Sequence, residues 1–347
     1  MIFLWWLRWG VVGILCSYIF GMALVLGLAL YWYVKKEYWL AFSVKQCKQK
    51  FFSYILLGLP FIPEDIISCL QSLHNQTSQP DEIIIVDSSD MPLIKFIAFT
   101  TLFTSEHFPQ AILTYQHTKP GLTYQRNIGI KLVTKEIVHF MDDDTVLAPD
   151  YLEKMNMTFV NHPQYAGGMG TITNIPVPVR ISLYRLMSCF FLLPRDYSSG
   201  KFTLSGMPTH AYGAKKLKKV EVLGGCCMSY RSSVFTKHKF DEKLQRYGYM
   251  EDCDFSRRVS YDWPLFYNGL AQLAHNPSPA NRDGIIDNRA MFIKNYSYLF
   301  FKNFYPKNRF KFLAYAWSIL GLFVLATLTR NKAYLKGYCK GLKEFYS

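Results

Sequence analysis

Short apolar runs alternate with amphipathic stretches through the middle of the chain. Phe52 to Gly58 and Glu82 to Val86 have the composition of buried strands, and Pro63 opens a helix between them whose apolar residues share one face. The pattern then predicts a strand at Ala111 to Tyr115, a helix at Gly121 to Val133, and strands at Glu136 to Met141 and Ala271 to Ala274. Strands that cross over through helices form a largely parallel sheet, so we expect an α/β fold with one doubly wound domain.

One long stretch breaks this regularity. Pro176 to Lys219 has no clear periodicity and contains Lys215, Lys216, Lys218 and Lys219. We expect it to form a mobile loop on the acceptor side of a binding site. The lysine cluster, or Arg282, is a candidate for holding a diphosphate group, and the alternative is a solvated basic face.

The N-terminal run is long enough to cross a membrane. No residue from Trp9 to Val34 is charged, and a helical span needs about 20 apolar residues. Its aromatic end at Tyr31 to Tyr33 is typical of a membrane interface and not of a signal-peptide cleavage site. Because the lysines follow the span at Lys35, Lys36, Lys45, Lys48 and Lys50, the positive-inside rule places the rest of the chain in the cytoplasm. We therefore assign residues 1–36 to a transmembrane anchor.

A second apolar run lies near the C-terminus, at Phe312 to Leu328, with basic residues on both sides. Such flanks favour a helix that lies in the membrane interface or dips into one leaflet. A second full span and a buried core helix are the competing readings. We assign residues 301–347 to membrane-associated helices and residues 50–300 to a catalytic domain.

The overall composition supports membrane contact and phosphate-rich partners. Half of the 347 residues are hydrophobic, and the formal net charge is +14. This charge fits nucleotide-sugars, lipid diphosphates and anionic membranes. Nucleic acid is not expected, because the basic residues cluster beside the apolar runs without a recognised binding motif. The eight cysteines show no C-x-x-C spacing, which fits a reducing compartment.

Carboxylates follow two of the predicted strands directly. Asp87 ends one strand, and the successive residues Asp142, Asp143 and Asp144 end another. In an open α/β sheet the ligand site lies beyond the carboxyl ends of the strands, so these side chains should meet in one crevice. Adjacent carboxylates repel one another, and a divalent cation relieves that repulsion. Mg²⁺ or Mn²⁺ bridging a diphosphate fits such oxygen ligands, and a solvated loop or helix N-cap is the alternative.

A second acidic group opens a predicted helix. Glu251, Asp252 and Asp254 precede a helical stretch that continues through Val259. A carboxylate at a helix start is oriented by the first-turn amides and could act as a general base. Ordinary helix capping by acidic residues is the alternative reading.

Taken in order, five segments resemble family 2 glycosyltransferases of the GT-A fold, a Rossmann-like, mostly parallel sheet flanked by helices. The resemblance covers roughly residues 52 to 275. The segments are Gln79 to Asp90 (QPDEIIIVDSSD), Gly121 to Ile130 (GLTYQRNIGI), Phe140 to Glu153 (FMDDDTVLAPDYLE), Val222 to Phe235 (VLGGCCMSYRSSVF) and Tyr249 to Arg258 (YMEDCDFSRR).

This resemblance implies a role for each candidate residue. Asp87, Arg126, Asn127, Asp142, Asp143 and Gly225 would contact the nucleotide-sugar donor; Asp142 and Asp144, with His275, would hold Mg²⁺ or Mn²⁺; and Asp252, beside Glu251, would be the catalytic base. Asp144 would be the more direct ligand of the D-x-D pair. For His275 a structural role is the alternative.

The resemblance implies an inverting enzyme. The turn after the first strand, Gly58 to Phe61, lacks the usual polar residues, and the Q-x-x-R-W motif of processive synthases is absent after Asp252. We therefore expect transfer of one sugar to a lipid-linked or cell-envelope glycan, at the cytoplasmic face of a bacterial-type inner or plasma membrane.

Two other functions are alternatives: a non-catalytic membrane protein that binds a nucleotide-sugar, and a sugar nucleotidyltransferase. Leu57 to Pro63 lacks the Gly-rich phosphate loop that a nucleotidyltransferase normally has.

Overall fold

The computed structural model describes residues 52–58, 63–88, 108–175, 183–193, 199–277 and 284–347. The chain separates into one unit at Met1–Lys48 and a second at Gln49–Ser347, and every described residue belongs to the second. The predicted membrane span at Trp9 to Val34, the turn at residues 59–62 and Arg282 lie outside the described residues.

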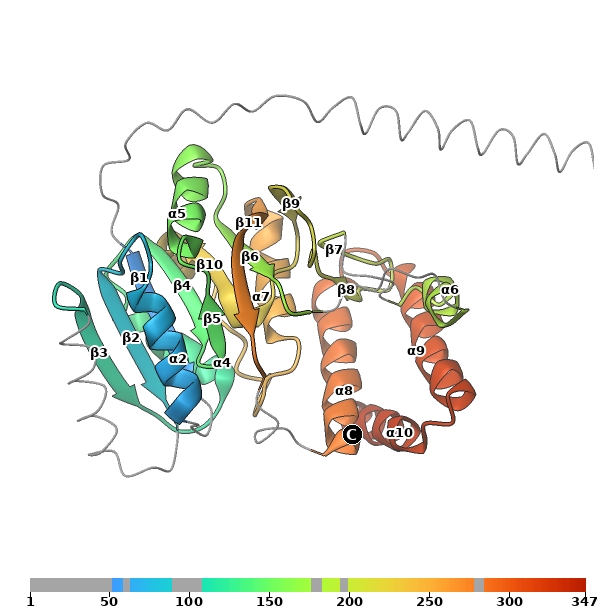
Figure 1. Ribbon diagram of the computed structural model, residues 1–347. Helices are drawn as coiled ribbons and strands as arrows, with labels where there is room; N and C mark the ends of the chain where they lie inside the picture. The colour runs from blue at the N-terminus through green and yellow to red at the C-terminus, as the bar shows by residue number, and fades with distance from the viewer. Residues whose placement is uncertain (1–51, 59–62, 89–107, 176–182, 194–198, 278–283) are drawn as a thin grey trace, which may run out of the picture. The chain divides into compact units, whose positions relative to one another are not determined.

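A nine-stranded sheet forms the centre of the second unit (Figure 1). Its strand order is β3-β2-β1-β4-β10-β6-β11-β5, and β9 pairs with β11. The strands are β1 (Phe52–Gly58), β2 (Glu82–Asp87), β3 (Ile112–His117), β4 (Ile137–Asp142), β5 (Thr145–Leu147), β6 (Gly167–Ile172), β9 (Lys218–Val220), β10 (Met228–Arg231) and β11 (Leu265–His275). A separate pair joins β7 (Lys201–Phe202) to β8 (Pro208–Thr209).

The first half of the sheet is parallel, as the sequence pattern predicts. β1 pairs in parallel with both β2 and β4, and β2 pairs in parallel with β3. The interior position predicted for β2 from its apolar composition is confirmed, since all its residues are buried. The second half is mixed because β10 runs antiparallel to both of its neighbours.

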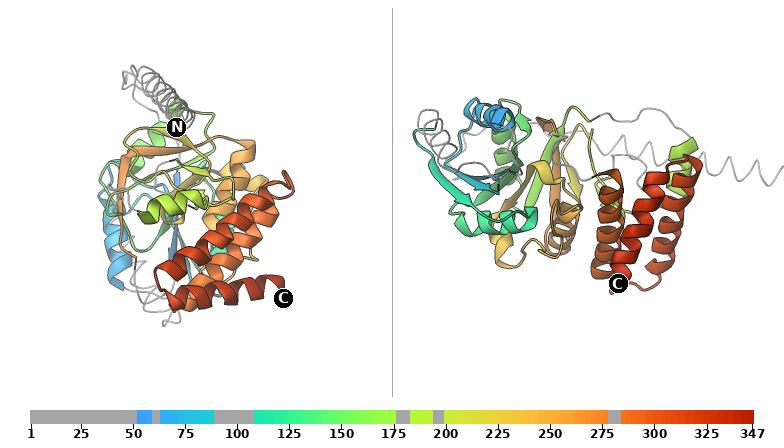
Figure 2. Two further views of the ribbon diagram at one scale, coloured as in Figure 1. Left: turned by 90° about the vertical axis from the view of Figure 1, so that its right-hand side faces the viewer. Right: turned by 90° about the horizontal axis from the view of Figure 1, so that it is seen from below.

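Helices cover both faces of the sheet (Figure 2). α2 (Pro63–His74) and α5 (Tyr151–Asn161) lie on one face, and α4 (Leu122–Leu132) and α7 (Glu251–Asp262) lie on the other. Two short 3₁₀ turns, η1 (Gly225–Cys227) and η2 (Ser232–Thr236), flank β10. This α/β sandwich is the predicted fold class.

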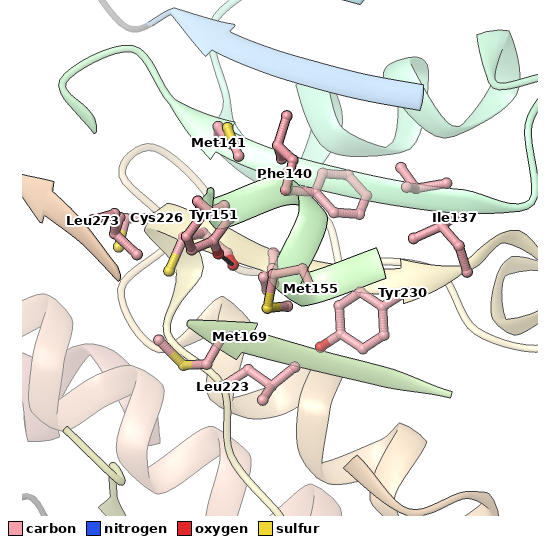
Figure 3. Packing of buried hydrophobic residues seen from close by; sticks show 14 of the residues in the cluster. Ile137, Phe140, Met141, Tyr151, Met155, Met169, Leu223, Cys226, Tyr230 and Leu273 are labelled. Carbon is pink, nitrogen blue, oxygen red and sulfur yellow. Dashed lines mark hydrogen bonds between the residues drawn. The ribbon is translucent and has the colours of Figure 1, made fainter. Parts of the chain in front are cut away.

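The main core lies between the sheet and α5 (Figure 3). Tyr151 and Met155 of α5 are fully buried there, and Phe140 of β4 is buried on the opposite face of the sheet, where its ring packs against Phe240. β6 approaches its neighbours closely because it is rich in glycine. A Cβ atom on Gly168 would overlap the ring of Phe266, so only glycine fits that position. The tight packing fixes β6 against β11, and β10 joins β6 to β4, whose end carries the acidic cluster.

The predicted loop at residues 176–219 is partly ordered structure. Its described part contains α6 (Leu183–Phe190) and the strands β7, β8 and β9. α6 packs on α9 (Lys311–Leu328): the indole of Trp317 donates a hydrogen bond of 2.8 Å to the carbonyl of Phe190, and the two rings lie 5.2 Å apart. The sequence pattern did not predict this helix or these strands, because α6 gains its stability from a partner distant in sequence.

Three helices form the last part of the described structure, and the first of them begins at Ile285. They are α8 (Ile285–Asn303), α9 and α10 (Lys332–Tyr346). Gly337 and Gly341 let α10 approach α8 closely, since a Cβ atom on Gly341 would overlap the carbonyl of Ala290. The Tyr315 hydroxyl of α9 donates a hydrogen bond of 2.7 Å to Ser297 of α8.

Among the described residues, one helix is long and apolar enough to cross a membrane, and it is α9. One side of it packs on α8, α6 and α10, while Leu313 and Leu320 on the other side are 71% and 49% exposed. Because one side of α9 is exposed, α9 is not a fully buried core helix.

Candidate active site

The carboxyl ends of β1, β2 and β4 lie at one edge of the sheet. In the register of the parallel strands, Gly58 pairs with Asp87 and Leu57 pairs with Asp142, so only β1 separates the two aspartates. The Tyr115 hydroxyl donates a hydrogen bond of 2.8 Å to Asp87 Oδ2. Topology therefore brings these residues to one edge, as the sequence analysis expects.

The acidic triplet and His275 form a compact group. Asp143 and Asp144 make the turn from β4 to β5, and β5 pairs with the end of β11, where Thr145 lies opposite His275. Ligand atoms of Asp142, Asp144 and His275 all lie within 4.8 Å of one another. His275 Nε2 is 3.2 Å from Asp144 Oδ1. Two carboxylates and an imidazole at this spacing could hold a divalent cation.

Mutual repulsion and burial shift the ionisation of this group. Burial, together with Asp142 and Asp144, raises the pKa of Asp143 to about 8. Burial alone would lower the pKa of His275, but Asp144 and Asp142 outweigh it and raise that pKa to about 9. The carboxylates of the triplet therefore repel one another, and a bound divalent cation would relieve this repulsion.

Arg126 joins the acidic triplet to the start of α7. Its side chain is completely buried and forms an ion pair with Glu251, while its Nη2 lies 3.6 Å from Asp142 Oδ1. Nη2 also donates a hydrogen bond of 3.0 Å to the Gly225 carbonyl. Burial raises the pKa of Glu251, and the guanidinium opposes that rise. Arg126 thus fixes the position of η1 relative to both acidic groups.

Two backbone amides orient Asp252. The Gly225 amide donates to Asp252 Oδ2 at 2.8 Å, and the Cys253 amide donates to Oδ1 at 2.7 Å. A Cβ atom on Gly225 would lie 2.9 Å from Glu251 Oε1 and 3.1 Å from Arg126 Nη2, so a larger residue would displace the η1 turn. The carboxylate of Asp252 is held in one orientation with lone pairs left for a further partner.

These groups open onto one cavity of about 650 Å³, a size typical of small-ligand sites. Asp142, Asp144, His275, Arg126 and Asp252 all line it. The rest of its wall comes from the C-terminal helices and the segment before β9. That wall contains Tyr184, Ser188, Leu193, Met207, His210, Tyr212, Arg289, Phe292 and Leu322.

Comparison with known proteins places this arrangement in a family. A sequence model described as Glycosyl transferase family 2 matches residues 63–238, about half of the chain. The chain belongs to glycosyltransferase family 2. The match runs from α2 to η2, and thus includes Asp87, the acidic triplet and Gly225.

Curated relatives of this family 2 chain are also glycosyltransferases. The amylovoran biosynthesis glycosyltransferase AmsE of Erwinia amylovora is 30% identical over 102 residues, which cover 29% of this chain and 37% of that protein. An uncharacterized glycosyltransferase of Haemophilus influenzae is 27% identical over 135 residues, covering 35% and 44%. This chain therefore matches less than half the length of these relatives.

Solved structures show that the family 2 chain has the GT-A fold. S. aureus TarS 1-349 superposes with a TM-score of 0.50 at 14% identity, covering 85% of this chain and 80% of that one. GalNAc-T7, solved with UDP, GalNAc and Mn²⁺, superposes with a TM-score of 0.53 at 12% identity, covering 72% and 47%. At such low identity these likenesses establish the fold alone.

Some predicted site residues of this glycosyltransferase do not reach the cavity wall. Asp87 stays at the sheet edge, and Asn127 is turned toward a neighbouring loop. The Asn127 amide donates to the Phe240 carbonyl at 2.9 Å and to Glu242 at 2.8 Å. Lys215 to Lys219, the predicted phosphate-binding cluster, are likewise absent from the cavity lining.

Sequence reasoning missed His210, Tyr212 and Arg289, which do line the cavity. His210 and Tyr212 stack with ring centroids 4.8 Å apart and an interplanar angle of 2°. They lie in the stretch without periodicity, where the only available signal was an isolated histidine beside an aromatic residue. Arg289 lies on α8 with its guanidinium 4.0 Å from the ring centre of Tyr334.

Proposed function

We propose that this family 2 glycosyltransferase moves one sugar from a nucleotide-sugar to a hydroxyl of a lipid-linked or cell-envelope glycan, with inversion at the anomeric carbon. The observation that carries the proposal is that the Asp142, Asp144 and His275 group and the oriented carboxylate of Asp252 open onto the same cavity. A cation-binding group and a base on opposite sides of a substrate are what a direct displacement requires.

The residues of the cation group fit Mg²⁺ or Mn²⁺. Asp144 Oδ1 is buried, and its polar neighbour among the described residues is Nε2 of His275 at 3.2 Å. A divalent ion held by Asp142, Asp144 and His275 would neutralise charge on the leaving diphosphate. Asp143 lines the cavity and would lie beside the donor. Asp87, at the sheet edge outside that lining, would contact the nucleoside.

Asp252 acts as the base in this proposal. It removes the proton of the acceptor hydroxyl while that oxygen forms a bond to the anomeric carbon. The bond from that carbon to the diphosphate oxygen breaks, and its electron pair leaves with the diphosphate. Attack from the side opposite the leaving group inverts the configuration. Glu251 and Arg126 position η1, and η1 in turn orients Asp252.

Screening a panel of nucleotide-sugars for thermal stabilisation tests the donor part of the proposal. With Mn²⁺ or Mg²⁺ present, the correct donor at 100 times its Kd should stabilise the folded protein by about 2.7 kcal/mol. The shift in melting temperature should disappear when the metal is removed by a chelator. If no nucleotide-sugar in a broad panel shifts the melting temperature, the assignment as a donor-using enzyme fails.

We further propose that the exposed apolar face of α6 and α9 lies on the cytoplasmic surface of a bacterial-type inner or plasma membrane. Leu183, Leu186, Phe190, Phe310, Leu313, Leu320 and Leu328 are all more than 45% exposed there. Basic residues adjoin both ends of α9: Lys307, Arg309, Lys311, Arg330 and Lys332. Apolar side chains bordered by cations match an anionic lipid surface.

The cavity extends to Tyr184 of α6 and Leu322 of α9, so a lipid-linked acceptor could reach Asp252 from this surface.

The double substitution Leu313→Glu and Leu320→Glu should weaken binding of residues 49–347 to anionic vesicles about tenfold, which corresponds to about 1.4 kcal/mol. Two carboxylates on the apolar face oppose insertion and repel anionic lipid. Co-sedimentation with phosphatidylglycerol vesicles measures the effect. Leu270→Glu is the matched control, because Leu270 is 52% exposed on β11. Equal loss from the control would contradict the assignment of this face.

A further inference from the structure

His210 lies beside Asp252 on the cavity wall, in a segment that none of the five sequence motifs includes. A ring nitrogen of His210, a carboxylate oxygen of Asp252 and the Sγ of Cys253 all lie within 4.8 Å of one another. The stacking on Tyr212 fixes the plane of the imidazole. His210 therefore presents a defined polar edge close to the base of the proposed reaction.

The hydrogen-bonding capacity of this pair is incompletely used. Nδ1 of His210 is buried and has no hydrogen-bond partner among the described residues. Each oxygen of Asp252 accepts one backbone amide, from Gly225 or Cys253, and keeps a further lone pair. Buried polar groups are normally satisfied, so partial satisfaction in a cavity points to a polar ligand group between them.

The spacing fits one oxygen atom. An oxygen that makes two hydrogen bonds of about 2.8 Å at a roughly tetrahedral angle separates its partners by about 4.6 Å. A ring nitrogen of His210 and a carboxylate oxygen of Asp252 lie no more than 4.8 Å apart, so one oxygen atom can reach both. A hydroxyl can donate its proton to the carboxylate and accept an N–H from the imidazole at the same time.

A metal ion is a poorer occupant of this second group. Burial raises the pKa of the Cys253 thiol well above its usual value, which disfavours the thiolate that a metal requires. Burial also lowers the pKa of His210, although Asp252 opposes the change. The neutral imidazole carries one N–H and can bind a hydroxyl oxygen without taking its proton.

We propose that His210 is a catalytic residue that donates a hydrogen bond to the reacting hydroxyl of the acceptor and holds it against Asp252. The inference rests on the proposed transferase function and assigns the acceptor subsite within it. In the transfer step the hydroxyl proton passes to Asp252, the oxygen bonds to the anomeric carbon, and the diphosphate leaves with the electron pair of the broken bond. His210 keeps its own proton throughout and orients the oxygen lone pair that forms the new bond.

Donor hydrolysis provides a test that needs no identified acceptor, because water then takes the place of the acceptor hydroxyl. The full-length protein is incubated with Mn²⁺ and the nucleotide-sugar that stabilises it most, and release of nucleoside diphosphate is measured. His210→Phe keeps a ring to stack on Tyr212 but removes the N–H. His210→Gln retains an N–H donor. His162→Phe, at the end of α5 and away from the cavity lining, is the control.

His210→Phe is expected to slow nucleoside diphosphate release about tenfold or more, with donor affinity in calorimetry unchanged. His210→Gln should retain a clearly larger fraction of the rate, and His162→Phe should match the wild type. Release by His210→Phe within twofold of wild type would overturn the inference, and so would a Gln variant no faster than the Phe variant. Failure of the transferase proposal itself is distinguishable, because then the wild type would bind no nucleotide-sugar in the presence of metal.

Discussion

Asp252→Asn should lower the rate of sugar transfer by about 10² to 10⁴-fold while leaving donor affinity nearly unchanged. The Gly225 and Cys253 amides donate to different oxygens of Asp252, so the single oxygen of an asparagine amide can accept from only one of them. The hydrogen bond from Arg126 to the Gly225 carbonyl does not involve Asp252 and still holds η1. What the variant loses is the ability to accept the proton of the acceptor hydroxyl. The rate loss should therefore appear in turnover, measured as nucleoside diphosphate release, and not in donor binding measured by calorimetry.

Asp262→Asn is the matched control for this variant. Asp262 is at the opposite end of α7 and pairs with Lys237 and His238 instead of lining the cavity. The same chemical change on the same helix should leave the rate of transfer close to wild type. If Asp252→Asn retained more than half of the wild-type rate, Asp252 could not be the base.

Asp144→Ala should abolish metal-dependent binding of the nucleotide-sugar. Asp142, Asp144 and His275 lie within 4.8 Å of one another, and loss of one carboxylate removes a charged ligand from that compact group. Without a bound cation, the donor diphosphate would face the remaining carboxylates directly and be repelled. Calorimetric titration of the donor with and without Mn²⁺ measures this: the metal should enhance binding to the wild type and have no effect on the variant.

Asp150→Ala provides the comparison for this second substitution. Asp150 precedes α5 a few residues later in the chain and forms an ion pair of 2.6 Å with Lys154 at the surface. Its removal should leave metal-dependent donor binding intact. Unchanged donor affinity of Asp144→Ala in the presence of Mn²⁺ would contradict the ligand assignment.

The location of the acidic groups could be predicted from the sequence because it depends on local rules. A buried apolar strand such as Glu82 to Val86 must end where polar residues begin, and parallel strands place such ends at one sheet edge. This reasoning placed Asp87 and Asp142 on a common edge, separated by β1. The helix predicted to begin at Glu251 was also found, since its acidic first turn is a local signal.

The role of Arg126 could not be predicted in the same way. Its ion pair with Glu251 and its hydrogen bond to the Gly225 carbonyl join residues about a hundred positions apart. Its motif places it next to the nucleotide, whereas the structure shows a fully buried side chain that links both acidic groups. The sequence motif identifies Arg126 as a charged residue. Only the packing of the folded chain decides that Glu251 is the partner that compensates its burial.

The sequence alone determined the α/β class, the elements from β1 to β4 in their order, and the acidic strand ends, because periodicity, helix starts and apolar composition act over a few neighbouring residues. The tertiary structure decided that α6 packs on α9, that the C-terminal helices line the cavity, and that His210 faces Asp252. Those contacts are made between segments that lie far apart in the chain, and several of the residues belong to a stretch without periodicity. Such contacts stabilise the protein only after the sheet has formed and brought the segments together.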